Sequence, residues 1–151
     1  MPPAPHAPRP RVDFYVLREE GEAAVGHFVC RLVEKAWRSG HRVYVHMPDD
    51  DAVARLDRLM WSYRQDSFLP HEPCTALDTQ PTAPVLIGST PAGPAHETEM
   101  LVNTGPSLPP FQGRFQRVAE IVSADPGERA AGRERYRHYR QQDVELHFHE
   151  L

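Results

Sequence analysis

A strand, an amphipathic helix and a second strand follow one another near the start of this chain, and this succession restricts the fold more than any other feature. Residues 11–17 are rich in β-branched and aromatic side chains, which is typical of a strand buried on at least one face. In residues 22–39, apolar side chains recur every three or four positions, and Gly40 then supplies a helix stop. Residues 42–47 predict the second strand. Because a crossover helix joins strands of the same direction, these segments predict a βαβ unit with parallel strands.

The pattern of alternating helices and strands continues after this unit. Three aspartates at 49–51 suit the N-terminus of a helix, where carboxylates cap free N–H groups and complement the helix dipole. An irregular stretch at 61–82 follows, and two short apolar runs at 84–89 and 99–104 then predict strands of the same sheet.

The last third of the chain leaves one assignment open. Residues 111–116 predict a helical turn, and residues 117–123 either continue it or form a strand. Pro126 suits the first position of a final helix, and alternating apolar residues at 144–148 predict an edge strand or an extended tail. The sequence therefore predicts an α/β fold: a single-domain, Rossmann-like, open and largely parallel twisted sheet flanked by helices.

Length and composition are those of one folded domain. The chain has 151 residues, of which we expect the proline-rich residues 1–10 to be a disordered lead-in and residues 11–151 to form the domain. No apolar run reaches the length of a membrane span, and the first residues lack the apolar core of a signal peptide. We therefore expect a cytoplasmic protein without a membrane partner.

Motifs for catalysis or cofactor binding are missing. The turn at 18–26, REEGEAAVG, has neither GxGxxG nor GxxxxGK[ST], so no nucleotide-binding loop is predicted. His147 and His149 share strand spacing, but no cysteine or carboxylate stands at a zinc-like offset from them. Neither cysteine lies in a nucleophile motif. The sequence predicts no cofactor, no metal and no enzyme, although an unrecognised site at the carboxyl ends of the strands stays open.

Positive charge is concentrated in residues 129–140, where five arginines and one glutamate give +4 in a chain whose net charge is −4. At 3.6 residues per turn, five of these side chains fall within an arc of about 100°. They are Arg129, Arg133, Tyr136, Arg137 and Arg140. Guanidiniums hold carboxylates or phosphates through paired donors, so this face predicts either a peptide carboxylate with a neighbouring apolar residue or a nucleic-acid backbone as ligand. A solvated helix face is the alternative.

A second candidate surface lies where large apolar groups leave a helix and enter a loop broken by proline. Its members are Trp61, Phe68, Pro70 and His71. Aromatic residues gathered at a surface are typical anchors of protein interfaces. The alternative is that Trp61 caps the core of its own domain.

Five segments together resemble the chi subunit of bacterial DNA polymerase III, in the order and spacing of that family over residues 11–140. They are FYVL at 14–17, WRSGHRVYV at 37–45, LDRLMW at 56–61, SFLPH at 67–71 and RERYRHYR at 133–140. The resemblance implies a Rossmann-like domain without nucleotide binding or catalysis. It also implies an adaptor that links the clamp loader, reached through the psi subunit, to single-stranded DNA-binding protein, so that DNA is contacted only indirectly.

The same resemblance implies which residues make these contacts. The tail of single-stranded DNA-binding protein, which is acidic and ends in a hydrophobic residue with a free carboxylate, would lie against the arginine helix. Arg133 holds the principal basic position, with Arg129, Tyr136, Arg137 and Arg140 beside it and Val118 or Ile121 lining the pocket. Psi, or an alternative helicase partner, would bind the surface of Trp61, Phe68, Pro70 and His71. The alternative function is a module that binds single-stranded nucleic acid directly through the arginine helix.

Overall fold

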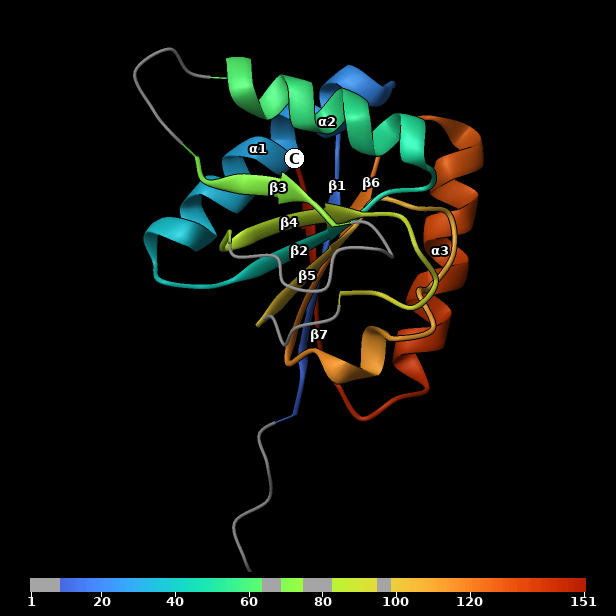
Figure 1. Ribbon diagram of the computed structural model, residues 1–151. Helices are drawn as coiled ribbons and strands as arrows, with labels where there is room; N and C mark the ends of the chain where they lie inside the picture. The colour runs from blue at the N-terminus through green and yellow to red at the C-terminus, as the bar shows by residue number, and fades with distance from the viewer. Residues whose placement is uncertain (1–8, 64–68, 75–82, 95–98) are drawn as a thin grey trace, which may run out of the picture.

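Seven parallel strands form one sheet in the computed structural model, which describes residues 9–63, 69–74, 83–94 and 99–151. The strands are β1 Arg11–Val16, β2 Val43–His46, β3 His71–Pro73, β4 Val85–Gly88, β5 Met100–Asn103, β6 Arg117–Val122 and β7 Glu145–Glu150. The helices are α1 Glu22–Arg38, α2 Asp50–Ser62 and α3 Pro126–Arg140, with a short 3-10 helix η1 at Gln112–Arg114. The strand order is β3-β4-β2-β5-β6-β1-β7 (Figure 1).

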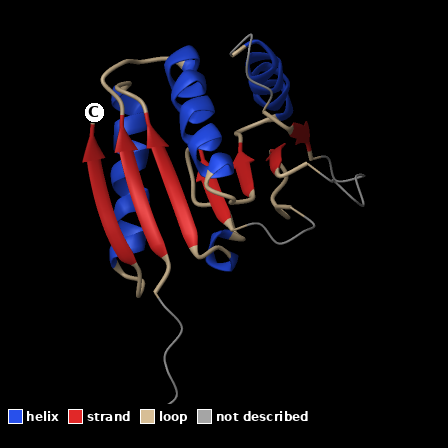
Figure 2. Cartoon of the chain, turned by 90° about the vertical axis from the view of Figure 1, so that its left-hand side faces the viewer, coloured by secondary structure: helices blue, strands red, loops and turns tan. Residues whose placement is uncertain are grey.

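Helices cover both faces of the sheet. Helices α1 and α2 lie on one face and α3 lies on the other (Figures 1 and 2). A first hydrophobic cluster fills the space between the sheet and α1 and α2, and a second fills the space between the sheet and α3 with η1. Central strands contribute to both clusters, which explains why the predicted strands read as almost continuous apolar runs. The predicted fold class, an open α/β sheet flanked by helices, is confirmed.

The predicted βαβ unit is confirmed, but its two strands are not neighbours in the sheet. Strands β1 and β2 run parallel, but β5 and β6 lie between them. The start of α2 also follows the prediction, because the Asp49 carboxylate accepts a hydrogen bond from the backbone N–H of Ala52 at 2.8 Å. Asp50 and Asp51 occupy the first turn, where negative charge complements the helix dipole.

One segment differs from the prediction, and two others decide between alternatives that the sequence left open. The stretch predicted as irregular contains the short strand β3, which pairs with β4 at one edge of the sheet. A three-residue strand that ends in proline carries too little alternation to be seen in the sequence. The ambiguous segment after η1 is strand β6, which is buried between β5 and β1. The last segment, for which an edge strand and an extended tail were both open, is an edge strand, because β7 pairs with β1 at the other end of the sheet.

Among the described parts of the chain, no helix combines the length and the apolar composition needed to cross a membrane.

Candidate functional site

A groove of about 490 Å³ opens between α3 and the β6-β1-β7 edge of the sheet. Its apolar surface comes from Phe14, Val16, Val122 and Phe148 on the strands and from Gly132 and Tyr136 on α3. Its charged surface comes from Arg129, Arg133, Arg137 and Arg140 of α3, with the carboxylate of Glu150 at the end of β7. Apolar side chains, several of them aromatic, and guanidinium groups therefore line the same groove.

The five residues that the helical spacing places on one face all line this groove. Arg129, Arg133 and Arg140 form no ion pair with any residue that the structure describes. Arg137 pairs with Glu134 one turn earlier, and both side chains are largely exposed. Exposed ion pairs of this kind contribute little to stability and exchange readily for an external anion. The groove thus offers guanidinium groups that are available to a ligand.

Aromatic rings meet edge to face across the groove and give it a defined shape. Tyr136 is half-buried, with its ring centroid 5.3 Å from that of Phe14 and 6.2 Å from that of Phe148. Phe148 is 55% exposed, the largest exposed fraction of any phenylalanine described. This arrangement leaves an aromatic surface open beside the guanidiniums, which suits an apolar side chain attached to a carboxylate.

Val118, which the family resemblance places at the pocket, does not line the groove. Its side chain is 1% exposed and packs in the second hydrophobic cluster beneath α3 and η1. Val122 lies four residues further along β6 and points to the same face of the sheet as Val118. It reaches the groove instead. Ile121 points to the opposite side of the sheet, where it joins the first cluster. The apolar contribution of β6 therefore comes from Val122, a residue that sequence reasoning did not select.

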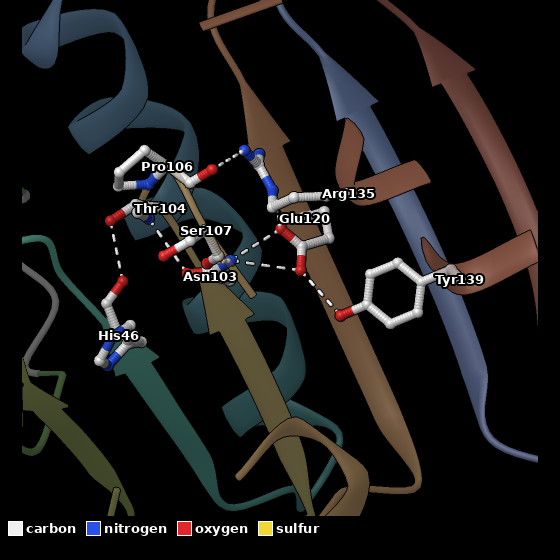
Figure 3. A network of polar contacts seen from close by, with 9 residues as sticks. His46, Asn103, Thr104, Pro106, Ser107, Glu120, Arg135 and Tyr139 are labelled. Carbon is white, nitrogen blue, oxygen red and sulfur yellow. Dashed lines mark hydrogen bonds and ion pairs between the residues drawn. The ribbon is translucent and has the colours of Figure 1, made fainter. Parts of the chain in front are cut away.

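A buried polar network sets the rotation of α3 about its axis (Figure 3). Arg135 is 4% exposed, and its Nε donates to Oε1 of Glu120 at 2.8 Å. Tyr139 donates its hydroxyl hydrogen to Oε2 of the same carboxylate at 2.8 Å, and Asn103 Nδ2 donates to Oε1 at 2.9 Å. Arg135 Nη1 also donates to the carbonyl of Pro106 at 3.1 Å.

The pKa of Glu120 lies above its ordinary value because the carboxyl group is buried. The charge of Arg135 and the hydrogen bonds from Tyr139, Arg135 and Asn103 oppose that rise of the pKa. Because Arg135 and Tyr139 are one helical turn apart and both point inward, the remaining arginines of α3 must point elsewhere. These arginines form a stripe that faces the groove. This stripe is rotated by roughly 120° about the helix axis from the inward direction of Arg135 and Tyr139.

Close backbone packing helps to hold α3 against the sheet. A Cβ atom built on Gly132 would lie 2.9 Å from Cγ2 of Val122. Such contacts are shorter than carbon atoms tolerate, so a side chain at this position would displace the helix or the valine. Gly132 thus brings α3 close to β6 at the floor of the groove.

Strand β7, which forms one wall of the groove, is attached to β1 by side chains on the opposite face of the sheet. Asp13 accepts hydrogen bonds from His149 Nε2 at 2.8 Å and from Arg11 Nε at 3.0 Å. Burial by itself would raise the pKa of Asp13, but Arg11 and His149 outweigh that effect and lower it. His147 pairs with Glu145. The two histidines considered as metal ligands therefore have carboxylate partners, and the described residues contain no group of three side chains placed to hold a metal ion.

The second candidate surface is described in part. Trp61 is 58% exposed, and its ring centroid lies 4.7 Å from that of His71. Such exposure favours the surface interpretation of Trp61 over a core cap. Pro70, which precedes His71 in the chain, is half-buried, and Phe68 lies outside the residues that the structure describes.

His71 supports Trp61 rather than standing at the surface. Its side chain is fully buried, its Nδ1 donates to the carbonyl of Leu69 at 2.7 Å, and its Nε2 lies 3.2 Å from Oδ1 of Asp57. An acceptor at each ring nitrogen fixes the orientation of the imidazole. A direct contact of His71 with a partner is therefore unfavourable in this geometry, and its effect on a partner would pass through Trp61.

The fold and the groove define a Rossmann-like protein whose distinctive surface is a cationic groove with an aromatic floor, on the α3 side of the sheet. The family model described as DNA polymerase III chi subunit, HolC matches residues 10–147. The chain belongs to this family of DNA polymerase III chi subunits. Membership implies an accessory role in replication, in association with the polymerase holoenzyme and without catalysis of its own.

Curated relatives support the same assignment, and each is named DNA polymerase III subunit chi. The relative from Pseudomonas aeruginosa is 38% identical over 93% of this chain and 96% of its own length. The relative from Escherichia coli is 30% identical over 84% of this chain and 88% of its own length. The relative from Haemophilus influenzae is 26% identical over 88% of this chain and 92% of its own length. The resemblance seen in the sequence segments is thereby confirmed.

A solved structure shares the architecture. The crystal structure of T4 UvsW aligns with a TM-score of 0.64 at 7% identity, covering 93% of this chain and 41% of that chain. At this identity the similarity shows the fold alone.

Proposed function

We propose that this chi-family protein links two partners in the cytoplasm: the α3 groove captures the acidic C-terminal tail of single-stranded DNA-binding protein, and the surface around Trp61 binds the psi subunit of the clamp loader or an alternative helicase. The observation that carries the proposal is the combination of three arginines without ion pairs among the described residues and an aromatic floor in one groove. DNA is then held indirectly, through the partner that coats it.

The chemistry of the groove fits the end of a polypeptide. A guanidinium group donates two parallel hydrogen bonds to a terminal carboxylate, and the last side chain can rest on Tyr136 and Phe148. Acidic residues upstream meet the remaining arginines of the groove. A few such contacts give affinities of about micromolar order, and they weaken with salt because the cations are exposed.

The first test compares an acidic peptide that ends in phenylalanine with the same peptide lacking that residue. We expect removal of the terminal residue to weaken binding by tenfold or more in a calorimetric titration, on the order expected for a buried aromatic anchor. A single-stranded oligonucleotide of equal charge is the control for the nucleic-acid alternative. Equal affinity for the two peptides would contradict specific tail capture, and tighter binding of the oligonucleotide with a steep salt dependence would favour the alternative.

The second test separates the two surfaces. We expect Trp61→Ala to abolish co-purification with psi, because an exposed tryptophan that becomes buried by a partner contributes about 2 kcal/mol or more. The affinity for the tail peptide should stay unchanged.

Phe148→Ala is the matched control, because it also removes a ring that is more than half exposed. It should weaken the tail peptide and leave psi binding intact. If Trp61→Ala reduces both activities together, the two surfaces are not independent and the assignment of psi to this patch is wrong.

A further inference from the structure

We propose that the captured tail pairs through its backbone with the outer edge of β7 and becomes an eighth strand of the sheet. This inference rests on the proposed function, and it adds how the peptide is held: main-chain hydrogen bonds to β7 supplement the side-chain contacts in the groove. Addition of a strand to an open sheet edge is a general mode of peptide recognition.

Strand β7 has one edge available. It is the last strand in the sheet order, and among the described strands it pairs with β1 alone. In Figure 2 it is the outermost strand, and no other described helix or strand lies along its outer side. An open edge presents a row of backbone donors and acceptors to another chain.

The register shows which backbone groups are available. The N–H of Glu145 donates to the carbonyl of Pro10 at 2.8 Å, and the N–H of Leu151 donates to the carbonyl of Val16 at 3.0 Å. In a parallel ladder, alternate residues direct both backbone groups to the same neighbour, so the odd-numbered residues of β7 bond to β1. Leu146, Phe148 and Glu150 therefore direct their N–H and C=O groups outward.

The edge and the groove form one continuous surface. The side chains of Phe148 and Glu150 line the groove, so the α3 side of β7 is the side on which the groove lies. An extended peptide paired with β7 would place every second side chain on that same side, because side chains alternate along a strand. Those side chains would meet the aromatic floor and the arginines of α3, while the backbone bonds to β7.

Charge selects the peptide that this surface accepts. Among the described residues that line the groove, four are arginines and one, Glu150, carries a carboxylate. The positive potential of the groove attracts an acidic peptide strand and repels a basic one. The occupant is therefore an extended acidic peptide with an apolar end, which is the same ligand that the groove itself suits.

The protein-side test compares Glu150→Pro with Glu150→Ala. Both remove the carboxylate, but proline also removes the outward N–H and places its ring on the open edge. The bonds to β1 survive because residues 149 and 151 supply them, and proline is tolerated on edge strands. We expect Glu150→Pro to bind the acidic peptide roughly fivefold to tenfold more weakly than Glu150→Ala, as the loss of strand hydrogen bonds implies. Matching circular dichroism spectra and thermal midpoints exclude unfolding.

The ligand-side test does not depend on how the variant folds. A series of acidic Phe-terminated peptides, each N-methylated at one backbone nitrogen, is titrated against the unaltered protein. Alternating loss of affinity along the series supports strand addition, because only every second N–H faces β7. If all methylated peptides bind like the parent, backbone pairing is overturned while tail capture stands. If the parent peptide fails to bind, both the proposed function and this inference are overturned.

Discussion

Replacing Glu120 with alanine is expected to lower the free energy of unfolding by about 3–5 kcal/mol, the range for removal of one partner of a buried ion pair. Glu120 is fully buried and accepts hydrogen bonds from Arg135, Tyr139 and Asn103. The variant leaves the guanidinium of Arg135 inside the protein without its counter-charge. Urea denaturation followed by circular dichroism measures the loss.

A paired replacement distinguishes a lost interaction from a lost side chain. Glu120→Leu combined with Arg135→Met removes both charges and keeps apolar volume, so it should be much less destabilising than Glu120→Ala. A loss below about 1 kcal/mol in Glu120→Ala would show that Arg135 does not depend on this carboxylate. The prediction would then fail, together with the argument that the network sets the rotation of α3.

The elements with strong local periodicity could be predicted from the sequence. Apolar residues at helical spacing predict α1, and Asp49 caps α2 with Asp50 and Asp51 in its first turn, as expected. The shared face of the arginines on α3 follows from the same arithmetic, since a single helix fixes the angles between its own side chains. Local rules thus located one half of the candidate site.

The other half depends on contacts between distant segments. The wall opposite α3 exists because β7 pairs with β1 in a register that brings Phe148 beside Tyr136. No local pattern in residues 144–151 specifies that neighbour or that direction. The sequence predicts a terminal edge strand or an extended tail, but the groove between this segment and α3 follows only from the sheet order.

The buried network is the clearest case of a feature hidden from sequence reasoning. Arg135 counts toward the positive charge of the helix, yet its charge is neutralised inside the protein by Glu120, a residue in a segment whose secondary structure the pattern left open. The available signal was the inward stripe of Gly132, Arg135 and Tyr139, spaced by three and four residues. A charged residue on an inward stripe indicates a buried partner, but it does not say which one.

Val118 and His71 are predicted at interaction surfaces, but neither side chain reaches the surface. Both lie next to exposed candidates in sequence or in family position, and both side chains are buried in the fold. Val118 supports the second cluster, and His71 packs beneath Trp61. Position in the sequence indicates the region of the fold in which a residue lies. Whether its side chain is exposed depends on which helix or strand packs over it.

Replacing Arg133 with alanine is expected to weaken binding of the acidic Phe-terminated peptide by about tenfold to a hundredfold, since hydrogen bonds to charged groups contribute about 1.5–3 kcal/mol. Arg133 lines the groove, is exposed and forms no ion pair with another described residue. Its removal therefore costs the ligand a partner without disturbing the fold. Titration calorimetry at low and moderate salt measures the effect, and the variant should show a shallower salt dependence than the parent protein.

The control is Arg31→Ala on α1, which removes the same charge from an exposed position on the opposite face of the sheet. If the groove recognises the tail through local hydrogen bonds, Arg31→Ala leaves the affinity within about twofold, because long-range attraction between exposed charges is screened beyond about 10 Å. Equal losses in the two variants would show that only net charge attracts the peptide. Unchanged binding in Arg133→Ala would remove Arg133 from the site, and with it the bidentate capture of the terminal carboxylate on which tail recognition depends.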